Sequence, residues 1–274
     1  MWWFILSLLI SSINDLIVKY LNLRLSPIEI SFYRAFLGTT TLIPIVLYQG
    51  RESIKTSKLT FHFIRGILLG LAISLWTQGL KSSQLIVATI VSFTIPIFVL
   101  ILATFFLKER VTPKLWILTF LGMIGVIITT APYNIDITDG SYTFIIASML
   151  FAILDVINKK YIIQETMLCM LFYSSLFTTI FLFIPLNFEL IVVPTTELIL
   201  LIPLAINSNA ILFCILKAFR LVSVSRLASL RYLELLFSGT LGYVIFHDEP
   251  NSHIFIGALI IIPTSFYIAS RRNI

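Results

Sequence analysis

Long runs of apolar residues alternate with short polar breaks along the whole chain. Each run is long enough for an α-helix to cross the hydrocarbon core of a bilayer, which takes about 20 residues. The breaks carry proline or charged residues, which suit helix ends. The pattern therefore predicts ten membrane-spanning helices, over residues 2–21, 28–48, 62–80, 85–107, 113–131, 141–160, 167–186, 197–217, 223–246 and 252–270.

The composition agrees with a chain that lies almost wholly in a membrane. Of the 274 residues, 58% are hydrophobic and 12% are charged, whereas soluble domains average about 45–50% and about 25%. These values exclude a soluble enzyme with a polar surface, and they exclude a disordered chain. Ten tightly connected helices also leave no room for a separate soluble domain. The expected class is an all-α integral membrane protein.

The positions of the basic residues predict the orientation. If the N-terminus is cytoplasmic, fourteen of the 19 Lys and Arg residues fall on the cytoplasmic side. Three fall on the outer side (Lys19, Arg24 and Lys81), and Arg34 and Arg231 lie inside apolar runs. Because cytoplasmic loops carry the excess of Lys and Arg, both termini are predicted to be cytoplasmic. The net charge of +6 is then a topology signal, and no nucleic-acid partner is expected.

Several short patterns recur about 140 residues apart, in the same order. Each half would hold five helices, and an odd number makes the second half enter the membrane from the opposite side. Such inverted repeats are typical of transporters, whose sites lie near the midplane between the halves. The predicted repeats are residues 1–135 and 136–274. The matching patterns are Asp15-x-x-x-Lys19 with Asp155-x-x-x-Lys159, Phe32-Tyr33 with Phe172-Tyr173, and Phe106-x-x-Glu109 with Phe246-x-x-Glu249.

Motifs spread over nearly the whole chain resemble the EamA-type drug/metabolite transporter superfamily. Within it, the chain is most similar to the S-adenosylmethionine uptake transporters of obligate intracellular bacteria. The residues that carry the resemblance include Ser11-Ser12-x-Asn14-Asp15, Trp76-Thr77-x-Gly79-Leu80, Ala88-Thr89-x-Val91-Ser92-Phe93-x-Ile95-Pro96, Leu154-Asp155-x-Ile157-Asn158-Lys159-Lys160, Leu171-Phe172-Tyr173-Ser174 and Arg231-Tyr232-Leu233-Glu234-Leu235.

The resemblance implies a secondary transporter of the bacterial cytoplasmic (inner) membrane that works by alternating access. It implies import of S-adenosylmethionine, in exchange for S-adenosylhomocysteine. One scaffold serves many substrates in this superfamily, so an exporter of amino acids, other small metabolites or drugs is the alternative. No cofactor and no metal ion is expected.

Arg231 and Glu234 are the first candidates for substrate binding, because charged groups in hydrocarbon are costly and usually face a cavity or a partner. They are three residues apart on one predicted helix and are expected to pair with each other. A zwitterionic ligand could replace this pair, with its carboxylate on Arg231 and its ammonium or sulfonium on Glu234. The alternative is a purely structural ion pair.

Asp15 and Asp155 each precede a lysine by four residues, Lys19 and Lys159 respectively. This acid-first spacing favours an ion pair along one helix, so both pairs are expected to be structural. Asp15, with Asn14 beside it, is also a candidate cation or proton site.

Arg34 has no acid at a suitable helical spacing in its own run. It therefore needs either a carboxylate from another helix, Asp15 or Glu234, or the carboxylate of a ligand.

Three aromatic residues complete the candidate site. Trp76 and Phe93 have polar neighbours at membrane depth, which indicates a hydrated cavity, although hydroxyl groups also bond across helices. An adenine ring and a sulfonium both favour aromatic walls. Tyr232 lies on an adjacent face of its helix and is expected to contact a different wall. Pro96 is expected to break or kink the fourth helix.

Other signals are missing from the sequence. Cys169 and Cys214 lie in apolar runs and predict neither a disulfide framework nor a zinc site. The chain has no phosphate-binding Gly-Lys-Ser/Thr loop and no His-Glu-x-x-His motif. The first apolar run has no basic region before it and no small-residue cleavage site, so it is predicted to be a membrane helix and not a signal peptide. An enzyme is not expected.

Overall fold

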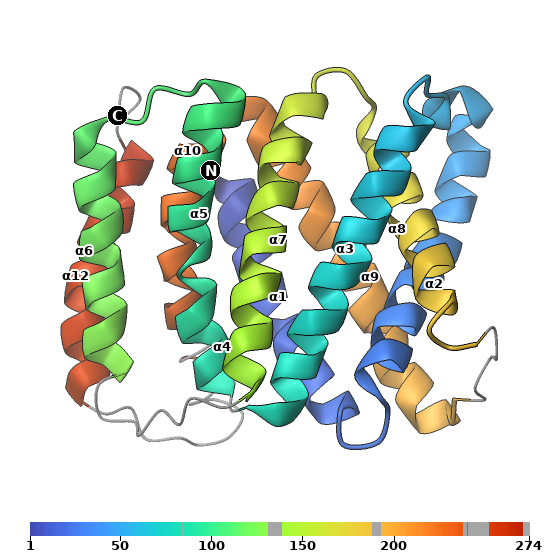
Figure 1. Cartoon of the computed structure of the whole chain (residues 1–274), viewed down its shortest axis with the longest axis horizontal. Coiled ribbons are helices and arrows are strands. Elements are labelled where there is room, and N and C mark those ends of the chain that lie inside the picture. The colour runs from blue at the N-terminus through green and yellow to red at the C-terminus, as the bar shows by residue number, and fades with distance from the viewer. Residues whose placement is uncertain (84, 131–138, 188–192, 238–239, 241–251, 271–274) are drawn as a thin grey trace.

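Helices make up nearly all of the ordered secondary structure in the computed structural model, which describes residues 1–83, 85–130, 139–187, 193–237, 240 and 252–270. Figure 1 shows them running roughly side by side, with most connections at the two ends of the molecule. In chain order they are α1 (Trp2–Leu21), α2 (Pro27–Gln49), η1 (Arg51–Ile54), α3 (Leu59–Ser82), α4 (Leu85–Ser92), α5 (Ile95–Leu102), the π-helical η2 (Ala103–Leu107), α6 (Pro113–Thr130), α7 (Asp139–Tyr161), α8 (Met167–Phe183), α9 (Thr195–Leu221), α10 (Val224–Ala228), η3 (Ser229–Leu233) and α12 (Ser252–Ser270).

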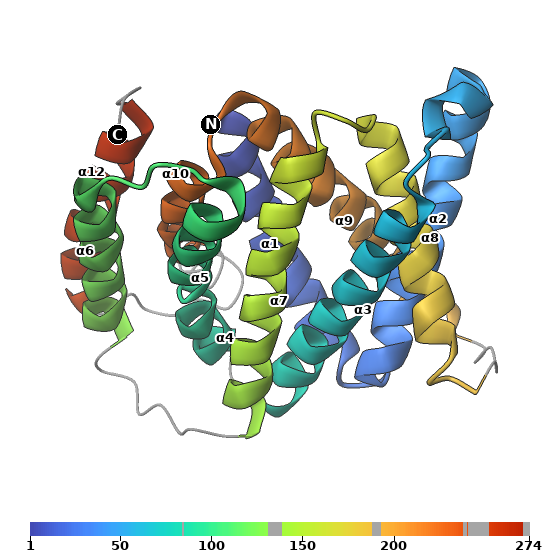
Figure 2. The same cartoon turned by 45° about the horizontal axis from the view of Figure 1, so that its top comes forward.

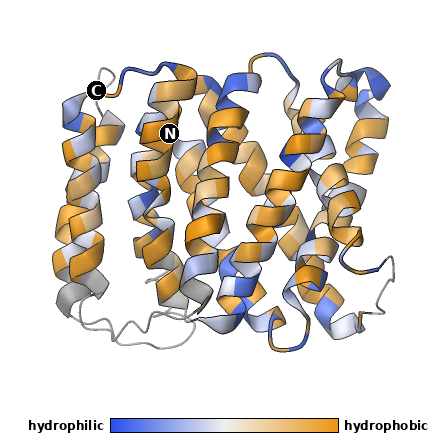
Figure 3. Cartoon of the chain, in the orientation of Figure 1, coloured by the Kyte–Doolittle hydropathy of each residue, from blue (hydrophilic) through white to orange (hydrophobic). Residues whose placement is uncertain are grey.

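The all-helical membrane class is confirmed. Among the described residues, six helical spans are long and apolar enough to cross a membrane, and three shorter apolar helices accompany them. Large hydrophobic side chains are exposed on many of these helices, and Figure 3 shows that hydrophobic residues predominate along the helices. A surface this apolar would be costly in water but is stable against lipid.

Two predicted helices are interrupted. The predicted 85–107 helix divides into α4, α5 and η2, with the break just before Ile95 and Pro96. Pro96 lies in the first turn of α5, a position that tolerates proline because no helical partner is needed there. The predicted 223–246 helix begins as α10 and continues as the 3₁₀ turn η3. Its predicted part after residue 237 falls mostly outside the described residues.

The helices pack in a fixed order from one end of the molecule to the other. Helices α6 and α12 form a pair at one end, and α2 and α8 lie at the opposite end (Figures 1 and 2). The central helices α1, α3, α7 and α9 stand between them. At the contact of α3 with α8, an added Cβ at Gly66 would lie only 2.4 Å from Cβ of Phe177. The small residue is therefore what permits this close approach.

Equivalent caps begin α2 and α8. The Ser26 side chain accepts a hydrogen bond from the Glu29 backbone N–H, and the Thr166 side chain accepts one from the Cys169 backbone N–H. Both residues satisfy N–H groups that have no partner within the helix. Between the same two helices, the hydroxyls of Thr39 and Thr179 lie 3.4 Å apart.

Two lysines bind the C-terminal ends of helices. The Lys19 ammonium donates to the carbonyls of Leu80 and Ser83, at 2.7 and 2.6 Å. The Lys159 ammonium likewise donates to two carbonyls at the C-terminal end of α9, those of Phe219 and Val222, at 2.5 and 2.7 Å. Cations are favoured at helix C-termini because carbonyl groups point outward there. We call these two arrangements the lysine clamps.

The lysine clamps correct one prediction. The sequence spacing favoured ion pairs of Asp15 with Lys19 and of Asp155 with Lys159. Instead, each lysine reaches carbonyls on another helix. The physical reason is that the last carbonyls of a neighbouring helix have no partner within that helix, so each lysine binds these oxygens across the interface.

A salt bridge ties the connection between α1 and α2 to α9. Arg24 Nη1 lies 2.8 Å from Glu197 Oε1. This hydrogen bond and the charge of the carboxylate raise the pKa of the Arg24 guanidinium.

Candidate functional site

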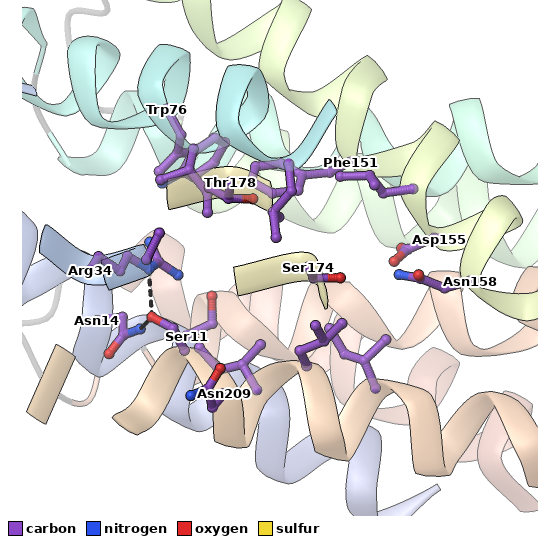
Figure 4. Close-up of a pocket in the computed structure, with 18 of the residues that line it drawn as sticks. Ser11, Asn14, Arg34, Trp76, Phe151, Asp155, Asn158, Ser174, Thr178 and Asn209 are labelled. Carbon is purple, nitrogen blue, oxygen red and sulfur yellow. Dashed lines mark hydrogen bonds between the residues drawn. The ribbon is translucent and has the colours of Figure 1, made fainter. Parts of the chain in front are cut away.

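A pocket with a volume of about 170 Å³ lies among the central helices. Its wall is formed by residues of α1, α2, α3, α4, α5, α7, α8 and α9, together with residues of η3 and the segment after it. Figure 4 shows polar side chains at both ends and aromatic rings along one wall.

Six of the eight residues predicted for the substrate site line this pocket. They come from four separated parts of the sequence, which the fold brings to one cavity. They are Asn14, Asp15, Arg34, Trp76, Arg231 and Glu234.

The two remaining candidates, Phe93 and Tyr232, lie elsewhere. Their side chains are almost fully buried, at 1% and 0% exposure, and neither contributes to the pocket wall. Their ring centroids are 5.3 Å apart in a hydrophobic cluster with Val126 and Ile261. They therefore join the α6–α12 end of the molecule to the rest of the fold. Tyr232 was expected to contact a different wall of the site, but its ring packs against Phe93 outside the pocket.

One end of the pocket carries Asp15 and Arg34, and we call it the Asp15 end. Trp76 Nε1 donates to Asp15 Oδ1 at 3.0 Å. The Nε group of Arg34 donates to the hydroxyl of Ser208, which also accepts from the Asn14 amide at 3.2 Å. Arg34 and Asp15 interact electrostatically but are more than 4 Å apart, since no salt bridge joins them among the described residues.

The other end carries Asp155 and Arg231, and we call it the Asp155 end. Arg231 Nη2 lies 2.6 Å from Asp155 Oδ2, and both side chains are largely buried. Figure 4 places Asp155 and Asn158 across the pocket from Arg34 and Asn14. The pocket therefore has ionic groups at both ends.

The pairing of Arg231 corrects a second prediction. The spacing of three residues suggested a pair with Glu234, but the partner of Arg231 is Asp155 on α7. Glu234 lines the same pocket and forms no salt bridge with Arg231 among the described residues. The 3₁₀ turn at Arg231 places residues three apart on one face, so a pair with Glu234 was possible by spacing; the fold instead brings Asp155 of α7 within 2.6 Å of Arg231.

Arg65 is a site residue that the sequence interpretation missed, because it was counted among the cytoplasmic loop cations. It lies inside α3, is 1% exposed, and lines the pocket. Its Nε donates to Asn158 Oδ1 at 2.9 Å, and its Nη1 faces His62 Nδ1 and the Met170 carbonyl. The signal was present in the sequence: a single arginine followed by a long apolar run marks a buried charge.

His62, Glu165 and Cys169 are spaced closely enough to hold a metal ion. The carboxylate Oε2 of Glu165 lies 3.5 Å from His62 Nε2 and 3.4 Å from Cys169 Sγ. Arg65 faces the other ring nitrogen of His62, and an arginine can only donate. Nδ1 is thereby assigned as the acceptor and Nε2 as the N–H that faces Glu165. The cluster then has its hydrogen bonds satisfied without an ion.

The EamA-like transporter family matches the chain over residues 1–131 and 139–270. The chain therefore belongs to this family, and it is a multi-pass membrane transporter and not an enzyme.

Individual relatives are similar to this chain over most of its length. The chain is 43% identical to the S-adenosylmethionine uptake transporter of Rickettsia conorii over 267 residues, covering 97% of this chain and 90% of the relative. It is 42% identical to the protein of the same name from Rickettsia bellii, with coverages of 97% and 91%. It is 26% identical to the riboflavin transporter of Brucella anthropi, covering 87% of this chain and 86% of that one.

The fold is also found in a solved structure. One crystal structure superimposes with a TM-score of 0.75 and 16% identity, covering 96% of each chain. At this identity the likeness concerns the fold alone.

Proposed function

We propose that this chain imports S-adenosylmethionine across a bacterial cytoplasmic membrane. The observation that carries the proposal is the identity of 41–43% to four rickettsial proteins named for this uptake, over 97% of the chain. The chain covers at least 90% of each of them, so the comparison concerns whole transporters.

The chemistry of the pocket supports this substrate. S-adenosylmethionine carries a carboxylate, an ammonium, a sulfonium, two ribose hydroxyls and an adenine ring. The pocket offers three acids and three arginines, with aromatic rings and several amides and hydroxyls between them. Buried charges of both signs are costly in a membrane. A ligand that carries charges of both signs can pair with them.

We further propose that residues 1–135 and 136–274 form two inverted repeats that rock against each other. Three features separated by about 140 residues support this: the lysine clamps, the side-chain caps of α2 and α8, and the pair of Thr39 with Thr179. A contact between residues at equivalent positions is expected where a pseudo-two-fold axis passes between the halves. Alternating access around the pocket then follows, with exchange for S-adenosylhomocysteine as one mode.

The proposed orientation has both termini in the cytoplasm. Figure 1 draws η1 and the α5–α6 and α7–α8 connections at one end of the molecule. The basic residues at or beside these connections include Arg51, Lys55, Lys108, Arg110 and Lys160. By the positive-inside rule this end faces the cytoplasm.

Uptake into proteoliposomes tests the function. Purified protein is reconstituted, and radiolabelled S-adenosylmethionine is offered outside vesicles preloaded with S-adenosylhomocysteine or with buffer. The proposal predicts uptake well above that of protein-free vesicles, and faster uptake with the preload if exchange occurs. Uptake equal to that of empty vesicles contradicts it. In that case the riboflavin-carrier and metabolite-exporter relatives indicate the substrates to test next.

A further inference from the structure

We infer that the methionine part of the substrate binds at the Asp15 end of the pocket, with its carboxylate on Arg34, its ammonium on Asp15 and its sulfonium against Trp76 and Phe151. The nucleoside then extends toward Asp155 and Asn158. This inference rests on the proposed function and assigns an orientation to the substrate within it.

The three arginines of the pocket differ in what their guanidinium groups already bind. Arg65 donates to Asn158 and to the Met170 carbonyl, and it faces His62. Arg231 forms its 2.6 Å ion pair with Asp155.

Arg34, by contrast, has one hydrogen bond, from Nε to the Ser208 hydroxyl. Within the described part of the chain, its two terminal nitrogens have no hydrogen-bond partner and no carboxylate within 4 Å. A guanidinium presents its donors as a planar fork that fits a carboxylate in bidentate geometry. Arg34 is therefore the pocket arginine whose fork is available to a ligand carboxylate.

Asp15 is placed to bind the ammonium on the same ligand carbon. Its Oδ1 accepts from the Trp76 indole, and its second oxygen has no hydrogen-bond partner among the described residues. It is near Arg34 but outside salt-bridge distance. An acid and an arginine held near each other without pairing suit an α-amino acid group, which brings both opposite charges together.

The aromatic wall lies where the sulfonium would fall. The Trp76 indole binds Asp15 directly, and its ring centroid is 6.0 Å from that of Phe151. Both residues line the pocket, on the same wall in Figure 4. The sulfur of the substrate is only three bonds from the carbon that carries the ammonium, so it stays close to Asp15. Aromatic faces attract such cations.

The Asp155 end suits the nucleoside. Asn158 accepts from Arg65 through Oδ1, which leaves its amide nitrogen as a donor for a ring nitrogen of adenine or a ribose oxygen. Ser174 and Thr178 line the pocket between the two ends (Figure 4). Arg231 and Asp155 already neutralise each other, and Arg65 binds Asn158 and the Met170 carbonyl, so the ionic groups at this end have partners within the protein.

The test removes the same interaction from the ligand and from the protein. Affinities of detergent-solubilised protein are measured for S-adenosylmethionine and for its decarboxylated analogue. The wild type should bind the analogue about 10- to 100-fold more weakly, the range expected for hydrogen bonds to charged groups. In Arg34→Gln this difference should shrink to less than about threefold, because the substrate falls to the affinity of the analogue.

Arg231→Gln is the matched control, since it removes an arginine of the same pocket. It should keep the full discrimination between the two ligands, whatever its effect on overall affinity. Arg34→Lys keeps the charge and should retain most of the discrimination, which shows that a loss in Arg34→Gln is not a failure to fold.

The outcomes are separable. In one contrary outcome, the affinity difference between the two ligands persists in Arg34→Gln and disappears in Arg231→Gln. That result overturns the proposal, because the substrate carboxylate then binds Arg231 and the substrate lies in the opposite orientation. Discrimination that persists in both variants also overturns it, because the carboxylate then lies at neither arginine. A wild type that binds the analogue as tightly as the substrate overturns the orientation while leaving the proposed function intact. A wild type that binds neither ligand contradicts the proposed function itself.

Discussion

The two ends of the pocket are built on the same frame but differ in how their charges are balanced. Asp15 and Asp155 occupy corresponding positions 140 residues apart, each four residues before a lysine clamp. Asp155 is paired with Arg231, whereas Asp15 accepts from a neutral indole and stands near an arginine without pairing with it. We call the Asp155 end closed, because its aspartate and arginine are paired with each other. We call the Asp15 end open, because its aspartate and arginine remain available to a ligand.

The sequence explains why the ends diverged. Residues 140 positions from Arg34, Trp76 and Arg231 are Ser174, Leu216 and Val91 respectively. The ionic and aromatic partners therefore occur in one half each, although the aspartates and lysines occur in both. The difference teaches that a shared backbone frame can hold an asymmetric site, as an asymmetric substrate requires.

The largest expected effect comes from opening the closed end. Asp155→Ala leaves the buried Arg231 guanidinium without its carboxylate, and breaking a buried ion pair costs about 3–5 kcal/mol. Thermal unfolding in detergent should show a marked loss of stability. Adding Arg231→Met to Asp155→Ala should restore most of it, because the uncompensated charge is removed. Equal stability of wild type and Asp155→Ala would mean that the pair contributes nothing.

The lysine clamps should behave alike at both ends. Lys19→Met and Lys159→Met each remove hydrogen bonds from an ammonium to two carbonyls. Each is expected to lower the free energy of unfolding by about 1–3 kcal/mol, measured in the same thermal assay. A loss in one variant and none in the other would show that the two clamps are not equivalent.

Asp15→Asn should separate transport from stability. The amide oxygen can still accept from the Trp76 indole, so the free energy of unfolding should change by less than about 1 kcal/mol. Loss of the negative charge should nevertheless reduce S-adenosylmethionine uptake by about tenfold or more. If Asp15→Asn is instead as unstable as Asp155→Ala, the open and closed ends do not differ as described.

The smallest expected effect concerns the aromatic wall. A cation–π contact is worth about 0.5–2 kcal/mol, and it favours the charged sulfonium over the neutral thioether of S-adenosylhomocysteine. Trp76→Leu should therefore lower the ratio of the two affinities by about 2- to 30-fold, measured by competition binding. Trp76→Phe, which keeps a ring but loses the indole N–H, should retain part of the ratio. An unchanged ratio in Trp76→Leu would place the sulfonium elsewhere.

Much of the helical framework could be predicted from the sequence. Runs of apolar residues gave α1 its bounds at 2–21 and placed α2, α6, α7 and α12 within about two residues. Hydrophobicity reports where a chain can lie in lipid, so it defines spans well. It does not report interruptions, and for that reason the 3₁₀ turn at Arg231 was not foreseen.

The site was predictable in its membership and not in its pairings. Rare charges in apolar runs identified Asp15, Arg34, Arg231 and Glu234, since each must face a cavity or a partner. The choice of partner depends on which helices touch, and sequence spacing describes only contacts along one helix. The pair of Asp155 with Arg231 spans 76 residues and therefore could not be derived from local spacing.

A cryo-electron microscopy structure of the protein with bound S-adenosylmethionine tests the central claim most directly. The account predicts ligand density in the pocket among α1, α3, α7 and α9, with the carboxylate within hydrogen-bonding distance of Arg34 and the adenine toward Asn158. Density outside this pocket, or an unoccupied pocket at saturating ligand, would contradict it.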